Sequence, residues 1–184
     1  MMAEIKKYTK ALYSGKSLLY PADTIWGLGC DATNQKAVNA LFALKKRPLE
    51  KPLIALVDSV DMLSKYVANL PENIEELLQS DRPTTLVYPQ GKGLANGVIS
   101  QNGNVAIRIP KPCFALDLIS AFGKPLVSTS ANLSGKPIPA AYSEIDPYIL
   151  AHVDEIVPLE KDRIASIPSR VLLLNPDGTL KPLR

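Results

Sequence analysis

Two short segments that lie far apart in the chain hold the residue types best suited to chemistry. The first, Lys45 to Pro48, closes an amphipathic helical pattern, and the second, Ser128 to Gly135, closes an apolar strand. The first segment supplies fixed positive charges, and the second supplies hydroxyl groups and one amide. Groups of these kinds suit an anionic ligand, so phosphates and carboxylates are the ligands to consider.

Lys45 lies on the apolar face of its predicted helix. Val38, Leu41 and Phe42 recur at helical spacing, and Lys45 follows Val38 by seven residues. A buried ammonium needs an anionic partner, which would be an internal carboxylate or a bound phosphate. The helix taken alone favours a different interpretation, in which the lysine stem covers apolar surface and its charge reaches solvent beyond the helix end.

Two further positions allow both a structural and a functional interpretation. Ser128 to Ser134 follow a strand, where serine and asparagine commonly form a turn or cap a helix. The carboxyl end of a strand in an α/β sheet is also where ligands bind. Arg108 shares a strand face with small Ala106, so it is either an ordinary surface arginine or a clamp for a carboxylate.

A glycine-containing segment, residues 20–29, follows the first predicted strand. Its glycines could let the backbone approach a ligand closely, or the segment could be a structural turn that packs Trp26. With Ala32, the spacing matches GxGxxA. We reject a dinucleotide fingerprint, because that motif needs its first glycine at the strand end and Ala22 to Trp26 intervene here.

Several catalytic classes lack the residues they need. His152 is the only histidine, so a Ser-His-acid triad or a multi-histidine metal centre would depend on one side chain in a helical segment. Carboxylates are scattered without a paired acidic cluster, and we expect no metal held by the protein. The chemistry is therefore expected to depend on cations and neutral donors.

The composition is that of a soluble globular protein. The chain has 184 residues, of which 46% are hydrophobic and 21% charged, and we expect a single domain over residues 1–184. A net charge of +3 permits an anionic ligand without demanding nucleic acid. No signal-peptide core or membrane-spanning run is visible, so a cytoplasmic location is expected, with Cys30 and Cys113 as reduced thiols.

Helical and strand patterns alternate along the chain. Helices are predicted over residues 4–13, 35–46, 62–67, 71–78, 113–122 and 143–152. Strands are predicted over residues 18–21, 52–57, 84–88, 105–110, 125–128, 155–158 and 169–174, and Asn175 to Gly178 predict the turn of a final hairpin. The pattern indicates an α/β fold with a mixed, twisted sheet.

Taken together, the motifs resemble the threonylcarbamoyl-AMP synthase family, whose domain is called YrdC-like. The matches follow the family order over nearly the whole chain. They pair residues 20–29 with YPT(E/D)TxYGLG, 45–48 with KxRP, 51–53 with KPL, 108–110 with RxP and 130–135 with SAN-x-SG. An ordered set of this kind is highly specific, and the length resembles the short stand-alone form.

The resemblance implies a fold and an activity. The fold would be a YrdC-like twisted mixed sheet with flanking helices around a basic cavity. The activity would be that of a nucleotidyltransferase, which makes L-threonylcarbamoyl-AMP from L-threonine, bicarbonate and ATP and releases pyrophosphate. The product would serve the modification of adenosine 37 in tRNA, so tRNA-modification transferases would act downstream. Magnesium would enter bound to ATP.

The resemblance also assigns roles to individual residues. Lys45 and Arg47 would neutralise the triphosphate, while Ser130 and Asn132 would orient the reacting groups, and these four would form the catalytic set. Ser128 and Ser169 would add nucleotide contacts. Thr24 and Arg108 would hold threonine.

The sequence departs from the family pattern at three places. Ala22 replaces a threonine, which removes a hydroxyl from the region expected to hold the amino acid. Asp81-Arg82-Pro83 replaces a PGP stretch, and Ser169-Arg170 replaces Ser-Thr. The substrate identity is therefore less firmly implied than the fold. The alternative function is an RNA-binding translation or ribosome-maturation factor that uses the same basic cavity, and its binding would weaken steeply with salt.

Overall fold

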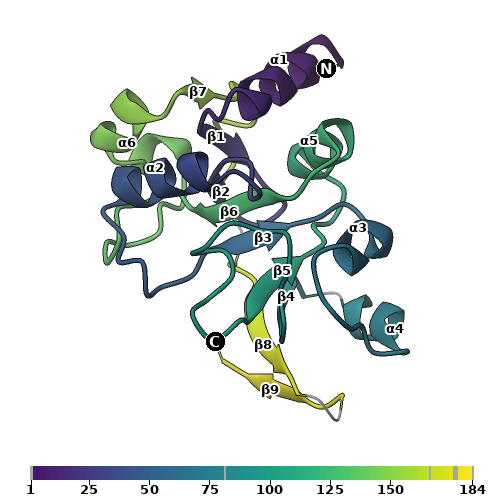
Figure 1. Cartoon of the computed structure of the whole chain (residues 1–184). Helices are drawn as coiled ribbons and strands as arrows, with labels where there is room; N and C mark the ends of the chain where they lie inside the picture. The colour runs from purple at the N-terminus through teal and green to yellow at the C-terminus, as the bar shows by residue number, and fades with distance from the viewer. Residues whose placement is uncertain (1, 81, 166, 176–177, 184) are drawn as a thin grey trace.

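The computed structural model describes residues 2–80, 82–165, 167–175 and 178–183 (Figure 1). Within these ranges, nine strands form a sheet in the order β7-β1-β2-β6-β3-β5-β4-β8-β9. The strands are β1 (Leu18–Pro21), β2 (Trp26–Gly29), β3 (Ile54–Leu56), β4 (Thr84–Tyr88), β5 (Val105–Arg108), β6 (Leu126–Ser130), β7 (Glu155–Ile156), β8 (Arg170–Leu174) and β9 (Leu180–Pro182). The helices are α1 (Met2–Tyr13), α2 (Gln35–Lys45), α3 (Val60–Ser64), α4 (Ile74–Leu78), α5 (Phe114–Phe122) and α6 (Pro147–His152), with a 3-10 turn, η1 (Tyr142–Glu144).

The sheet is mixed, as the sequence predicted. β1 pairs in parallel with β7, β3 with β5, and β4 with β8, while the remaining neighbours are antiparallel. Figure 1 shows α1 and α5 beside each other near β1, whereas α3 and α4 lie farther along the sheet. Tyr8 of α1 meets Phe114 of α5 edge to face, with ring centroids 5.9 Å apart.

Helix α2 begins and ends at residues that explain its length. The Asn34 side chain accepts hydrogen bonds from the backbone N–H groups of Lys36 and Ala37, which caps the first turn. The helix ends at Lys45, because Lys46 adopts a left-handed conformation with φ of +49°. The predicted end was one residue later, and Pro48 lies beyond it in the following loop.

Strand β2 explains why residues 20–29 contain glycines. A Cβ atom on Gly29 would lie 2.1 Å from the Val127 carbonyl oxygen, and one on Gly27 would lie 3.2 Å from the Tyr20 ring. The glycines therefore let β2 pack closely against its neighbours. Trp26 is fully buried, which agrees with the structural interpretation of this segment.

Smaller differences arise at element ends. The helix predicted over 143–152 is divided into η1 and α6, because Asp146 caps a new helix that starts with Pro147. Strand β6 continues to Ser130, so three residues of the polar segment, Ser128 to Ser130, belong to the sheet. Strands β8 and β9 form the predicted final hairpin. Residues 176 and 177 of its turn, and Asp81 of the departing stretch, lie outside the described residues.

Among the described helices, not one combines the length and the apolar character that crossing a membrane requires.

Candidate active site

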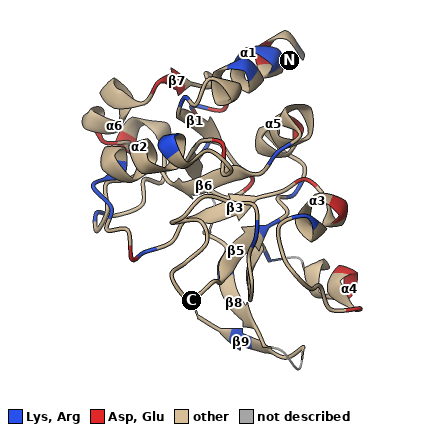
Figure 2. Cartoon of the chain, viewed as in Figure 1, with Lys and Arg blue, Asp and Glu red and all other residues tan. Residues whose placement is uncertain are grey.

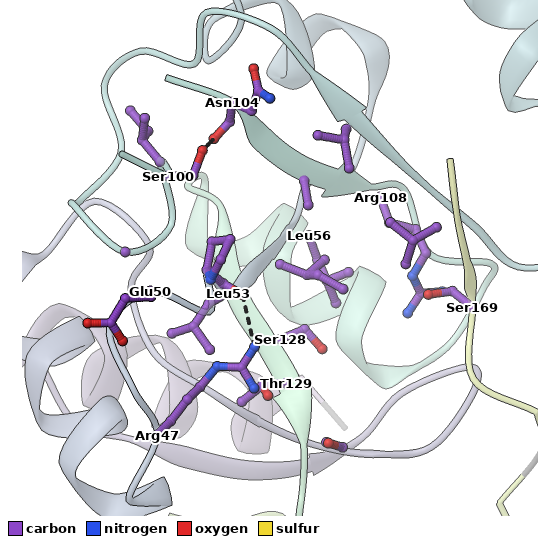
Figure 3. A pocket seen from close by; sticks show the side chains of 18 of the residues that line it. Arg47, Glu50, Leu53, Leu56, Ser100, Asn104, Arg108, Ser128, Thr129 and Ser169 are labelled. Atoms are coloured by element: carbon purple, nitrogen blue, oxygen red, sulfur yellow. Dashed lines mark hydrogen bonds between the residues drawn. The ribbon is translucent and has the colours of Figure 1, made fainter. Parts of the chain in front are cut away.

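A cavity of about 1050 Å³ opens beside strands β3, β5, β6 and β8 (Figure 3). Six of the eight residues singled out from the sequence line it, namely Thr24, Arg47, Arg108, Ser128, Ser130 and Ser169. Lys45 and Asn132 are not among the lining residues. The chain thus brings residues from five distant segments to one hollow.

The charges of the cavity are few and separated. Arg47, Glu50 and Arg108 are the charged residues among those that line it. Figure 3 shows Arg108 and Ser169 toward one side of the cavity and Arg47 and Glu50 toward the other. Figure 2 shows that lysines and arginines also occur on other elements, such as α1, so positive charge is not confined to this region. The lining therefore holds two positive charges and one negative charge.

Arg47 is held by the segment that leads into β3. Its Nε donates to the Lys51 carbonyl oxygen at 2.8 Å, and its Nη2 donates to that of Pro52 at 3.0 Å. These two bonds fix the plane of the guanidinium at the cavity wall. A planar cation in a fixed orientation suits phosphate oxygens.

Arg108 forms a buried ion pair with Asp23. Its Nη1 lies 2.7 Å from each carboxylate oxygen, and the two side chains are only 5% and 6% exposed. The backbone N–H of Lys111 donates to the same carboxylate at 3.1 Å. The interpretation of Arg108 as an ordinary surface arginine is therefore wrong: it clamps a carboxylate, and this carboxylate comes from the chain itself.

Lys45 is 1% exposed, so its charge does not reach solvent beyond the helix end. Its Nζ donates to the backbone carbonyl oxygens of Ser130 and Asn132, at 2.5 and 2.6 Å. Burial, with a smaller contribution from the charge of Arg47, lowers its pKa from 10.5 to about 7. Its partners are main-chain dipoles on the loop that the sequence had marked as functional.

The loop after β6 is fixed by its own polar groups. Ser130 Oγ donates to Asn132 Oδ1 at 2.5 Å, and Asn132 Nδ2 donates to the Lys136 carbonyl oxygen at 2.5 Å. The Ser134 N–H donates to the Lys45 carbonyl oxygen at 2.9 Å. Lys45 therefore holds this loop through both its side chain and its backbone. Ser130 is the residue of the loop that lines the cavity.

Thr24 and Ser169 complete the predicted set. Thr24 lines the cavity from the turn between β1 and β2 and is almost fully buried. The Ser169 hydroxyl lies 2.8 Å from that of Thr85 on β4. Ala22, where the sequence lacks an expected hydroxyl, is buried and lies outside the cavity lining. Its carbonyl oxygen accepts a hydrogen bond from Arg163 Nη2 at 2.5 Å.

Sequence reasoning missed the amide side chains of the cavity lining. They belong to Gln35, Asn39, Asn96, Gln101, Asn102 and Asn104. Gln35 Oε1 accepts from the Asn96 N–H at 2.8 Å, and this bond ties the loop before β5 to α2. The four-residue spacing of Gln35 and Asn39 and the repeated asparagines of residues 96–104 were the available signals. Over the part of the chain that is described, no group of three histidine, cysteine or acidic residues could hold a metal ion.

Comparison with known proteins identifies relatives that match most of the chain. The family model Sua5_yciO_yrdC, described as "Telomere recombination", matches residues 10–184. The threonylcarbamoyl-AMP synthase of Pseudoalteromonas translucida is 40% identical over 152 residues, which cover 78% of this chain and 81% of that protein. The enzyme of the same name from Xanthomonas euvesicatoria is 34% identical over 166 residues, which cover 88% and 89%.

Similar solved structures include those of a Sua5 protein. A variant of P. abyssi Sua5 superposes with a TM-score of 0.90 at 28% identity over 100% of this chain. The complex of P. abyssi Sua5 with L-threonine superposes with a TM-score of 0.83 at 28% identity, over 95% of this chain and 52% of that one. The chain thus spans about half the length of that Sua5 protein. Since the family model covers nearly all of its residues, this chain belongs to the Sua5, YciO and YrdC family.

Proposed function

We propose that this chain is an L-threonylcarbamoyladenylate synthase that uses L-threonine, bicarbonate and ATP. One observation carries the proposal: the cavity holds one fixed arginine at each of two separate positions, with serine hydroxyls among its other lining residues. This arrangement suits a pair of substrates that carry a carboxylate and a triphosphate. Relatives that bear the synthase name match most of the chain.

The chemistry needs positioning more than a protein nucleophile. The amine of threonine takes up the carbon of bicarbonate with loss of water and forms a carbamate. A carbamate oxygen then attacks the α-phosphorus of ATP, and the bond from this phosphorus to the bridging oxygen of pyrophosphate breaks. The products are L-threonylcarbamoyl-AMP and pyrophosphate. Orientation of the reactants and stabilisation of developing negative charge supply the rate acceleration for such a displacement.

The chain's residues divide between the two substrates. Arg108 and Thr24 would hold threonine, and Arg47, Ser128, Ser130 and Ser169 would bind the nucleotide. In this proposal Lys45 and Asn132 act indirectly, because they fix the loop that holds Ser130 at the cavity.

The proposal extends to the cellular setting of the reaction. Mg²⁺ would arrive with ATP and shield its phosphates. The adenylate would pass in the cytoplasm to a transferase that modifies position 37 of tRNA, since a mixed anhydride of this kind hydrolyses unless it is consumed.

The decisive experiment measures both products and follows the carbon of bicarbonate. The purified chain is incubated with Mg-ATP, ¹³C-bicarbonate and L-threonine, and both pyrophosphate and the mass of the adenylate are measured. We expect pyrophosphate release that requires all three substrates, together with an adenylate that carries the ¹³C label. Release of pyrophosphate without bicarbonate would instead indicate direct activation of the threonine carboxylate, and absence of the adenylate would refute the proposal.

A further inference from the structure

The turn between β1 and β2 is held in place by two arginines. Asp23 in this turn pairs with Arg108 of β5, and the neighbouring Ala22 carbonyl accepts from Arg163 Nη2. Inside the turn, the Ala22 N–H donates to the Ile25 carbonyl oxygen at 3.3 Å. Thr24, the next residue after Asp23, lines the cavity from the same turn. The contacts of Asp23 therefore fix the positions of two cavity residues, Thr24 and Arg108.

The ion pair uses only one nitrogen of Arg108, a residue that lines the cavity. In the part of the chain that is described, both hydrogen bonds of Arg108 leave from Nη1, and both end on Asp23. An arginine has five N–H donors, so the three on Nε and Nη2 are not used by this carboxylate. Nε and Nη2 form the edge that grips a second carboxylate with two parallel hydrogen bonds.

Asp23 is itself anchored, so it can orient its partner. The Lys111 N–H donates to its carboxylate from the segment after β5, which places the carboxylate between that segment and Nη1. Both side chains of the pair are nearly inaccessible to water. A buried guanidinium without this partner would carry an uncompensated charge, which is strongly unfavourable. Removal of the Asp23 charge should therefore displace the Arg108 side chain.

We propose that Asp23 is a positioning residue for the amino-acid substrate: it holds Nη1 of Arg108, so that the Nε and Nη2 edge of this guanidinium receives the substrate carboxylate. The inference rests on the proposed function and adds to it a residue that does not line the cavity. Because Asp23 already balances the charge of Arg108, the site recognises the planar shape of a carboxylate more than its charge alone.

The test compares Asp23→Asn with Asp31→Asn. Asparagine keeps the size of the side chain and removes its charge. Asp31 is a matched control, because it is also buried and pairs with Lys124 at 3.1 Å, yet it lies outside the cavity lining. Steady-state kinetics of adenylate formation give the KM for threonine and for ATP, and calorimetry gives the Kd for L-threonine.

We expect Asp23→Asn to raise the threonine KM and Kd by roughly 10- to 100-fold, since it breaks a buried charge pair. The ATP KM should change by less than about threefold, because the nucleotide contacts are on other residues. Asp31→Asn should leave both constants near those of the wild type. Asp23→Asn should also add little to the defect of Arg108→Lys, because both changes act on one guanidinium.

Each outcome decides between the two ideas. If Asp23→Asn folds and binds threonine as tightly as the wild type does, the proposed role of Asp23 is wrong. Formation of the adenylate by the wild type would still support the proposed function in that case. Equal loss of threonine and ATP affinity would indicate a general structural role and would also overturn it. If the wild type neither binds threonine nor forms the adenylate, both ideas fail. Should Asp23→Asn not fold, Asp23→Glu keeps the charge on a longer stem, and the same selective loss of threonine affinity is required.

Discussion

Lys45 carries a buried charge that should change how folding stability depends on pH. Burial lowers its pKa in the folded protein from 10.5 to about 7. In the unfolded chain the ammonium is hydrated and keeps its ordinary pKa. Between these two values the unfolded state binds more protons than the folded state, so the free energy of unfolding rises with pH. Below pH 7 both states are protonated, and the contribution no longer varies.

The size of this effect follows from the shift. One pKa unit corresponds to about 1.4 kcal/mol, so a rise from pH 7 to pH 9 should add about 2 kcal/mol to the free energy of unfolding. Lys45→Met keeps much of the apolar stem and removes the titrating group. The variant should lose this pH-dependent gain. It should also leave the carbonyl oxygens of Ser130 and Asn132 without their donor, at about 1–3 kcal/mol each.

Urea unfolding at pH 7, 8 and 9 measures the free energy of unfolding of the wild type and of Lys45→Met. Lys46→Met is the matched control, because Lys46 is the exposed neighbour and its Nζ lies 4.6 Å from the Tyr148 ring centroid. Burial raises the pKa of the Cys30 thiol and lowers stability at the alkaline end, but all three proteins share this effect. If the free energy of unfolding changes with pH by the same amount in the wild type and in Lys45→Met, the reasoning from burial is refuted.

Three other substitutions give distinct expectations. Arg47→Ala should raise the ATP KM by about tenfold and the threonine KM much less, which steady-state kinetics would show, and the reverse pattern would reject the phosphate role. Ala22→Thr should leave the kcat/KM ratio of threonine to serine unchanged, because Ala22 lies outside the lining, while overpacking costs about 1–3 kcal/mol in urea unfolding. Gly29→Ala should lower the urea midpoint strongly, since its Cβ would lie 2.1 Å from the Val127 oxygen, and a wild-type midpoint would contradict the packing of β2.

Sequence patterns predicted the fold well where local signals agree with tertiary packing. Strand β4 was predicted with the bounds that the structure gives, and Gly123 ends α5 in the left-handed conformation that favours glycine. Strand β2 was missed, because its glycines have low strand propensity and indicated a loop. They are accommodated because the Tyr20 ring and β6 fill the space beside them. That compensation comes from residues distant in sequence, so a local pattern could not predict it.

The candidate site was predicted by residue type but not by partner. Arg108 was expected to meet a carboxylate, yet its partner Asp23 lies 85 positions away and has no spacing that marks it. Lys45 was expected to meet a carboxylate or a phosphate or to reach solvent, and it meets two backbone carbonyls instead. Every residue has a carbonyl, so such partners leave no trace in the sequence.

The two arginines of the proposed site share one physical property. Arg47 is fixed by carbonyls of the segment before β3, and Arg108 is fixed by Asp23. Each is oriented when the chain folds, so substrate binding need not order a long flexible side chain. Preorganised charge of this kind stabilises a transition state more than mobile charge does. Substitutions that keep charge but change shape, such as Arg108→Lys, should therefore impair the reaction nearly as much as loss of the charge.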